Sequence, residues 1–263
     1  TSARSGPSVA YAHAMDSGVP PIASRDVETS SPQTPDLTVV IPAHDEAPFI
    51  TGALESVLGQ RWTRDRIEVV VVANGCTDDT AGMVRSFSAA HPDLRVRLIE
   101  LAEAGVGNAR NAGARSARAP LLIFMDADAR MTPYVVARAV KLDRSGVAAA
   151  TYRMLADSRD LLDRGFFWYM ELITVLRGVR TFNFYCRRDV FLAQGGFDPT
   201  IRVAEVIDLF KRFGEAGIGV EHVPTVILTS PRRIRKGPLR IGLLRTTVRW
   251  ALASRGIGRS RRY

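Results

Sequence analysis

The fold of this chain is decided by the stretch LLIFMDAD, residues 121–128, in which five apolar residues run directly into two acids separated by one small residue. The apolar run predicts a strand buried on both faces, as in a parallel sheet, whose carboxyl end is where open α/β sheets bind ligands. Alternation along the strand sends Asp126 and Asp128 to the same side, and Ala127 leaves room between them. The pair therefore predicts a site for Mg²⁺ or Mn²⁺ carrying a diphosphate, because these ions keep positions open for phosphate oxygens.

The sequence around this stretch alternates between predicted strands and predicted helices. Strands are expected over residues 37–41, 67–72, 96–101 and 120–125, and helices over 48–58, 80–90 and 108–117. This alternation predicts right-handed βαβ units on a mostly parallel sheet, which is an α/β fold. After Asp128 the pattern loosens, with helices expected over 133–142, 166–176, 188–194 and 204–216 and strands over 147–152 and 223–228. Gly195 and Gly196 are expected to close helix 188–194, because glycine supplies the left-handed C-cap.

Composition is that of a globular protein large enough to bury a substantial core. The chain has 263 residues, of which 46% are hydrophobic and 24% are charged. Its two cysteines, Cys76 and Cys186, form no disulfide framework, so a reducing compartment is the default expectation. The four histidines are scattered, which argues against zinc. No apolar run reaches the ~18 residues needed to span a bilayer.

The positive charge is concentrated at the C-terminal end. Residues 231–263 carry ten Arg, one Lys and no acid, whereas the other residues have 25 bases and 27 acids, so the net charge of +9 is the sum of +11 and −2. A candidate helix over 239–253 places apolar residues on one face and Arg245 and Arg249 on another, which predicts binding to an anionic membrane interface. Residues 1–36, rich in Ser, Pro, Thr and Ala, are expected to form a disordered arm.

Four segments of chemical interest follow predicted strands in order. They are VIPAHDE at 40–46, VVANGCTDDT at 71–80, GVGNARNAG at 105–113 and DAD at 126–128. Polar groups after the first two strands can read a base and ribose, with Glu46, Asn74 and Asp78 as candidates. Asp78 equally suits the N-cap of the following helix, and both roles can coexist.

The remaining groups in these segments narrow the chemistry. Glycines around Asn108 let backbone approach a ligand at a helix start, where amide dipoles favour phosphate. A dinucleotide site is disfavoured, because PAHDE stands at 42–46, where the glycine fingerprint should follow the first strand. Cys76 is expected to be a packed loop residue and not a nucleophile, since no His neighbours it in sequence.

The ordered set, together with Arg187-Arg188 and the segment GGFDP at 195–199, resembles the family 2 glycosyltransferases of the GT-A fold over residues 37–228. The resemblance implies a transferase domain over 37–230, with a nucleotide-binding half at 37–128 and an acceptor half at 129–230, followed by the basic tail 231–263. It implies a nucleotide-sugar donor, UDP- or GDP-linked, and a divalent cation held by Asp126 and Asp128 that neutralises the departing diphosphate. The donor contacts implied are Pro42, Ala43, Glu46, Asn74, Asp78, Arg110, Asp126 and Arg233.

Family membership also implies inversion at the anomeric carbon, which needs a general base for the acceptor hydroxyl. In the family an adjacent Glu-Asp pair beyond the Gly-Gly-Phe segment supplies it. Here Glu205 matches the first acid, but Val206 replaces the aspartate. Glu205 is therefore the first candidate base and Asp208, on roughly the same helical face, the second, while both are also compatible with solvated helix charges.

Two further departures from the family pattern affect the donor side. Ala73 stands where many relatives have an acid, so base recognition would lean on Asn74. TSPRR stands at 229–233, where some relatives place a metal-binding His. Arg232 or Arg233 could contact the diphosphate there, or belong to an ordinary basic surface.

The favoured interpretation is a hexosyltransferase-type enzyme acting on a hydroxyl acceptor, lipid-linked or part of a cell-envelope glycan, in the cytoplasm at the inner face of the membrane. A nucleotidyltransferase would place a glycine-rich, Arg-containing loop after the first strand, which is missing here. Nucleic-acid binding through the tail is disfavoured by the near-neutral body and the lack of a readout motif. An inactive transferase is suggested by Val206. The aromatic segment 166–173 fits either core packing or a lipid-facing wall beside the site.

Overall fold

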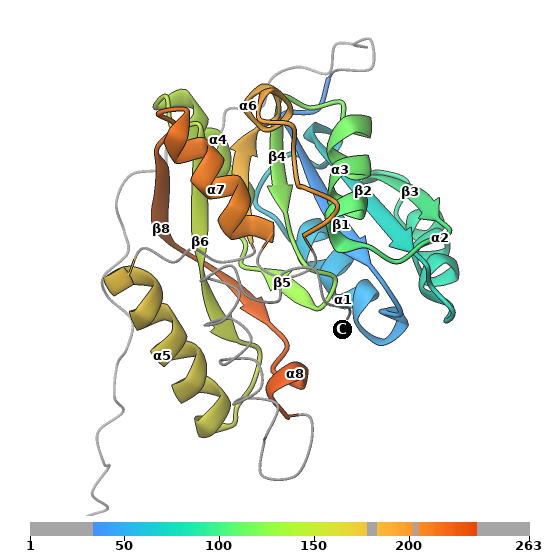
Figure 1. Cartoon of the computed structure of the whole chain (residues 1–263). Coiled ribbons are helices and arrows are strands. Elements are labelled where there is room, and N and C mark those ends of the chain that lie inside the picture. The colour runs from blue at the N-terminus through green and yellow to red at the C-terminus, as the bar shows by residue number, and fades with distance from the viewer. Residues whose placement is uncertain (1–33, 178–182, 202–204, 236–263) are drawn as a thin grey trace, which may run out of the picture. The chain divides into compact units, whose positions relative to one another are not determined.

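The computed structural model of the chain describes residues 34–177, 183–201 and 205–235 (Figure 1). Most of the predicted arm and the candidate helix 239–253 lie outside these described residues. None of the helices in the described part is long and apolar enough to cross a membrane.

One eight-stranded sheet organises the described residues, with strand order β3-β2-β1-β4-β7-β6-β8-β5. The strands are β1 Leu37–Ala43, β2 Ile67–Asn74, β3 Arg95–Leu101, β4 Leu121–Phe124, β5 Ala129–Met131, β6 Ala149–Ala156, β7 Phe184–Arg187 and β8 Val220–Thr229. The first four strands pair in parallel, β7 is antiparallel to both of its neighbours, β6 and β8 are parallel, and β5 is antiparallel to β8. The predicted α/β fold with a mostly parallel sheet is therefore confirmed.

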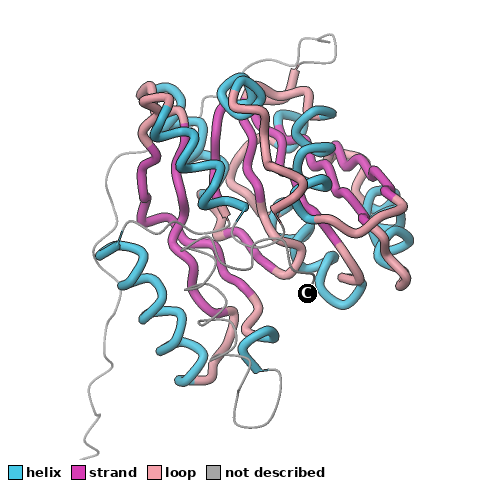
Figure 2. Tube along the Cα trace, viewed as in Figure 1, coloured by secondary structure: helices cyan, strands magenta, loops and turns pink. Residues whose placement is uncertain are grey.

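Helices flank this sheet in the order that the sequence predicts (Figure 2). They are α1 Ala47–Leu58, the short 3₁₀ helix Arg64–Arg66, α2 Thr80–Ala90, α3 Val106–Ser116, α4 Val135–Arg144, α5 Leu161–Arg177, α6 Arg188–Ala193, α7 Glu205–Glu215 and α8 Arg232–Arg235. The largest shift is in α5, which begins five residues before the predicted start at residue 166, because Asp160 Oδ1 accepts the amide proton of Leu162 at 2.8 Å and so starts the helix earlier. Gly195 and Gly196 follow α6 with φ of 74° and 69°, which confirms the predicted left-handed termination.

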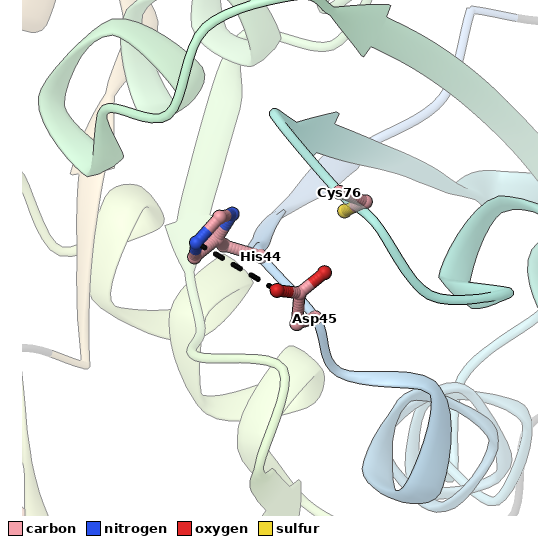
Figure 3. Close-up of side chains that lie close together, drawn as sticks. All are labelled: His44, Asp45 and Cys76. Carbon is pink, nitrogen blue, oxygen red and sulfur yellow. Dashed lines mark ion pairs between the residues drawn. The ribbon is translucent and has the colours of Figure 1, made fainter.

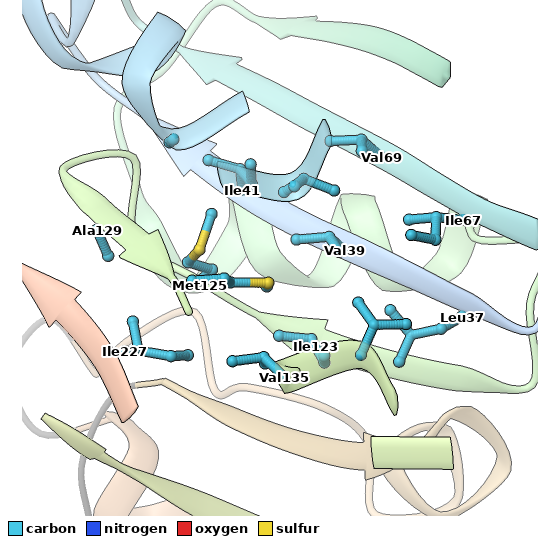
Figure 4. Packing of buried hydrophobic residues seen from close by; sticks show 14 of the residues in the cluster. Leu37, Val39, Ile41, Ile67, Val69, Ile123, Met125, Ala129, Val135 and Ile227 are labelled. Carbon is cyan, nitrogen blue, oxygen red and sulfur yellow. The ribbon is translucent and has the colours of Figure 1, made fainter. Parts of the chain in front are cut away.

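The central strands of the sheet are buried on both faces. Successive residues of a strand point to opposite sides, so each strand contributes apolar side chains to both cores. Val39 and Ile41 belong to the larger core cluster, part of which Figure 4 shows, whereas Val40 belongs to the second cluster on the other side, together with Phe124. A Cβ on Gly113 of α3 would lie 2.4 Å from Val40 Cγ1, so glycine is what allows this helix to approach β1 closely. The tight packing holds fixed the strand ends from which the polar loops emerge.

A buried carboxylate at the opposite, amino-terminal end of the sheet gives a first stability prediction. Glu68 on β2 accepts hydrogen bonds from Thr38 Oγ1 (2.7 Å) and the Arg118 amide (2.9 Å), and pairs with Arg97 at 2.9 Å. Burial alone would raise the pKa of Glu68, but these donors lower it overall. Its contribution to stability is therefore present above the unfolded-state pKa and lost as the pH falls through the lowered folded-state value.

Replacement Glu68→Gln is expected to lower the free energy of unfolding at neutral pH by about 1–3 kcal/mol, since the amide leaves Arg97 without its charged partner. Urea unfolding of both proteins over a range of pH measures this difference. It should narrow in acid, and a difference that stays constant down to strongly acidic pH would contradict the assignment.

Candidate functional site

The loops that follow β1, β2 and β3 are joined by one side chain. Asn74, at the end of β2, donates from Nδ2 to the Ala43 carbonyl at 2.7 Å and accepts from the Gly105 amide at 2.9 Å. The next residue, Gly75, has φ of 61°, and a Cβ there would lie 2.6 Å from the Ala104 nitrogen. Asn74 thus lies at the end of a strand, as the sequence predicts. Its side-chain amide binds backbone groups, so Asn74 holds the three loops together.

Two aspartates, Asp78 and Asp45, accept hydrogen bonds from backbone amides at or just before the starts of α1 and α2. Asp78 accepts the amide protons of Ala47 and Thr80, the first residues of α1 and α2, each at 3.0 Å. Burial alone would raise the pKa of Asp78, but these hydrogen bonds lower it overall. The N-cap of α2 is Asp79, so the predicted N-cap assignment of Asp78 is wrong by one residue, although Asp78 still binds the first amides of two helices. Asp45 accepts the Thr77 amide at 2.7 Å, a bond that lowers the pKa of Asp45.

Three potential metal ligands lie close together in the loops after β1 and β2, as Figure 3 shows. One ligand atom each from His44, Asp45 and Cys76 lies within 4.8 Å of the others, the one such group of three in the described part of the chain. His44 Nδ1 lies 2.8 Å from the Asn74 carbonyl, so it donates there and leaves Nε2 facing Asp45. No His neighbours Cys76 in sequence, but parallel pairing of β1 and β2 brings their loops together and places His44 close to it. Nitrogen, sulfur and oxygen ligands suit Zn²⁺ better than Mg²⁺.

The two acids after β4 lie in a turn, not in the strand. β4 ends at Phe124, so strand alternation does not set the directions of Asp126 and Asp128, and that part of the prediction is wrong. Asp126 Oδ1 lies 2.9 Å from Arg110 Nη2, whereas Asp128 Oδ2 lies 2.8 Å from Arg232 Nε. The two carboxylates remain near one another: burial raises the pKa of Asp128, and the charge of Asp126 raises it further.

Arg110 of α3 links the two halves of the predicted domain. Its guanidinium is 2% exposed and lies 2.5 Å from Glu205 Oε1 as well as beside Asp126, with the Phe197 ring 5.4 Å away. Burial alone would lower the pKa of Arg110, but the two carboxylates raise it overall, so the group stays charged. The sequence places Arg110 at the donor, but this ion-pair bridge was missed because Glu205 is 95 positions away in the chain.

Arg232 of α8 lies against two acids at the predicted cation site. It contacts Glu46 as well as Asp128 and stacks over the Phe49 ring, 4.4 Å from its centre. Burial raises the pKa of Glu46 and of Asp128, and the charges of Arg232 and Arg233 partly offset this effect. Glu46 Oε2 is buried, and no described residue donates a hydrogen bond to it.

These carboxylates fit a hard divalent cation. Asp126 and Asp128 would supply the predicted oxygen ligands, and the buried Glu46 Oε2 near Asp128 has no donor among the described residues. Carboxylate oxygens are the ligands that Mg²⁺ and Mn²⁺ prefer. Burial disfavours the charged form of Asp128 and of Glu46. The positive charge of a cation would offset this effect.

The two candidate bases on α7 have different surroundings. Glu205 is buried against Arg110 and so reaches the site. Asp208 instead pairs with Arg212 at 3.0 Å, and Arg212 also donates to the Gly196 carbonyl at 2.7 Å. Val206 is fully buried in the core, so no acid lies at the position where the family pattern expects the aspartate.

Comparisons with known proteins agree with this architecture. The family model for glycosyl transferase family 2 matches residues 38–185. Glycosyltransferase AglE of Haloferax volcanii is 29% identical over 79% of this chain and 72% of its own length. The chain spans half or less of the length of other curated relatives that it matches.

Solved structures give the same picture. A mannosyltransferase from Pyrobaculum calidifontis, PcManGT, in complex with GDP-Man and Mn²⁺, has a TM-score of 0.63 and 26% identity, covering 86% of this chain and 68% of its own. Staphylococcus aureus TarS in complex with UDP-GlcNAc has a TM-score of 0.55 and 18% identity over 67% of this chain and 52% of its own, which is a likeness of fold alone.

Proposed function

The chain belongs to the family 2 glycosyltransferases, and from that premise we propose that it moves a hexose from a nucleotide-diphosphate sugar to a hydroxyl acceptor with inversion. The observation that carries the proposal is the Arg110 bridge, which joins Asp126 at the donor end of the sheet to Glu205 on α7. An inverting transfer needs positive charge at the departing diphosphate, here a cation that a carboxylate would hold, and a base near the attacking hydroxyl. The bridge holds one carboxylate of each kind against a single buried guanidinium.

On the donor side, the loops fastened by Asn74 and Asp78 form the proposed base and ribose subsite, with backbone from Pro42 and Ala43. Asp126 and Asp128 would hold Mg²⁺ or Mn²⁺, with Glu46 beside them. When bound, this cation would supply charge neutralisation for the departing diphosphate. Arg232 and Arg233, whose charges already act on these acids, would contact the phosphates of the donor.

On the acceptor side, Glu205 is the proposed general base. Its ion pair with Arg110 fixes the position of one carboxylate oxygen, and the other oxygen would take the acceptor proton as the hydroxyl attacks the anomeric carbon. Asp208 remains the second candidate, although its pairing with Arg212 supports a structural role.

The donor nucleotide is proposed to be UDP or GDP. PcManGT was solved in complex with GDP-Man and Mn²⁺, which supports a nucleotide-sugar donor and a divalent cation here. The acceptor is proposed to be lipid-linked or a cell-envelope glycan. The excess of positive charge in residues 231–263 supports a protein held at an anionic membrane surface on the cytoplasmic side.

A thermal-shift screen of UDP- and GDP-sugars with Mn²⁺ tests this function. A ligand that binds only the folded state stabilises it by about 2.7 kcal/mol at 100 times its Kd, so the correct donor should raise the Tm by several degrees. The same sugars with a chelator serve as the control, in which most of the rise should disappear. Stabilisation by no nucleotide sugar would refute the donor assignment.

A further inference from the structure

Helix α5 has the reverse of the polarity normally found on a surface helix. Its two acids, Asp163 and Glu171, are buried, while six of its large apolar residues are exposed. The exposed set comprises Leu161, Leu162, Trp168, Tyr169, Leu172 and Val175, with Leu161 78% and Trp168 60% exposed. Of the predicted aromatic segment 166–173, core packing therefore holds for Phe167, whereas Trp168, Tyr169 and Leu172 are exposed.

These exposed residues form one surface, which we call the α5 face. Residues 161, 168, 172 and 175 recur at intervals of three, four or seven, so they share one side of the helix, and Leu162 and Tyr169 lie beside them. A contiguous apolar patch on a soluble protein marks a site of interaction. Trp and Tyr side chains are enriched where an apolar phase meets water, as at the surface of a bilayer.

The acids of α5 are neutralised from within the protein. Glu171 Oε1 contacts His222 Nε2 at 2.8 Å and Arg153 Nε at 3.1 Å. Asp163 accepts from Ser158 at 2.7 Å and pairs with Arg235. Among the α5 side chains that the structure describes, the one exposed charge is that of Arg164, so nothing acidic on the α5 face would repel an anionic surface.

The chain that continues from α8 carries matching charge. Arg235, the last described residue, is the one paired with Asp163, so residues 236–263 leave the described structure next to the first turn of α5. These 28 residues contain eight Arg or Lys and no acid. Lys and Arg close to an anionic bilayer contribute about 1 kcal/mol each to binding.

We propose that the α5 face binds the surface of an anionic lipid bilayer. The bilayer would cover the aromatic and aliphatic side chains that water now contacts. This goes beyond the proposed transfer activity, because it assigns the bilayer contact to a particular helix of the catalytic domain and not to the tail alone.

Vesicle co-sedimentation with a charge-matched pair of variants tests the proposal. Trp168→Glu with Leu172→Glu alters the α5 face, and Met83→Glu with Tyr134→Glu alters exposed apolar residues on α2 and before α4. Both pairs change the net charge equally. Partitioning onto vesicles containing phosphatidylglycerol should fall about tenfold or more for the first pair and change little for the second. The proposal is overturned if both double variants lose vesicle binding equally. It is also overturned if the wild-type protein binds neutral phosphatidylcholine vesicles as well as it binds vesicles containing phosphatidylglycerol.

A second measurement needs no disruption of the α5 face. The chain has three tryptophans, so Trp62→Phe with Trp250→Phe leaves Trp168 as the only one. Lipids brominated in the acyl chain should quench the emission of Trp168 when the protein binds. Unquenched emission from vesicle-bound protein would mean that another segment, such as 236–263, makes the apolar contact, and would overturn the assignment to α5. Donor-induced thermal shifts of both variants should match wild type, which separates this result from failure of the proposed transfer function.

Discussion

Glu205→Gln is expected to lower kcat by about 10²–10⁴-fold, the usual contribution of a general base. The amide keeps the shape of the side chain and a hydrogen bond to Arg110, but it cannot accept the acceptor proton. Donor affinity should change little, because the donor contacts lie on the Asp126 side of Arg110. Steady-state kinetics with the donor identified by the thermal screen, together with nucleoside diphosphate binding by calorimetry, measures both effects.

The matched control for this variant is Asp208→Asn, one helical turn further along α7. Asp208 is held by Arg212, which also binds the Gly196 carbonyl, so its loss is expected to lower stability with kcat close to wild type. A normal kcat for Glu205→Gln combined with a large loss for Asp208→Asn would reverse the two assignments. Normal turnover in both variants would remove α7 from proton transfer.

Asp128→Asn is expected to abolish most of the cation-dependent affinity for nucleoside diphosphate and to lower kcat/KM by about 10²-fold or more, since a bound cation contributes several kcal/mol to stabilising the departing charge. Chelation should reduce the wild-type protein to the same level. Calorimetric titration of UDP and GDP with and without Mn²⁺ measures the difference.

Asp157→Asn provides a control for the general effect of removing an acid near this edge of the sheet. Asp157 is exposed, and its ion pair with Arg130 is long, at 3.9 Å. Its replacement should therefore leave cation-dependent binding unchanged. An Asp128→Asn protein whose Mn²⁺-dependent affinity equals that of wild type would exclude Asp128 as a ligand.

The first half of the fold was readable from the sequence because each of its elements carries a complete pattern. β1 and β2 are buried along their whole length and mostly apolar, β4 is apolar throughout, and α2 occupies the predicted residues 80–90. β5 and β7 were missed because strands of three and four residues are too short to display a period, and both pair antiparallel with distant segments.

The sequence predicts which loops contribute residues to the site, but it does not predict the ion pairs between those residues. The sequence identifies Asp126, Asp128 and Glu205 as candidates. It does not reveal that Arg110 lies between Asp126 and Glu205, or that Arg232 spans Asp128 and Glu46, 186 positions away. Such long-range ion pairs depend on how α3, α7 and α8 pack, which no local pattern encodes.

The single turn of α8 joins two distant parts of the described structure. Its first residue, Arg232, pairs with the carboxylates of Asp128 and Glu46, and its last, Arg235, pairs with Asp163 in the first turn of α5. One helical segment about 6 Å long therefore connects the proposed cation site to the helix that carries the α5 face.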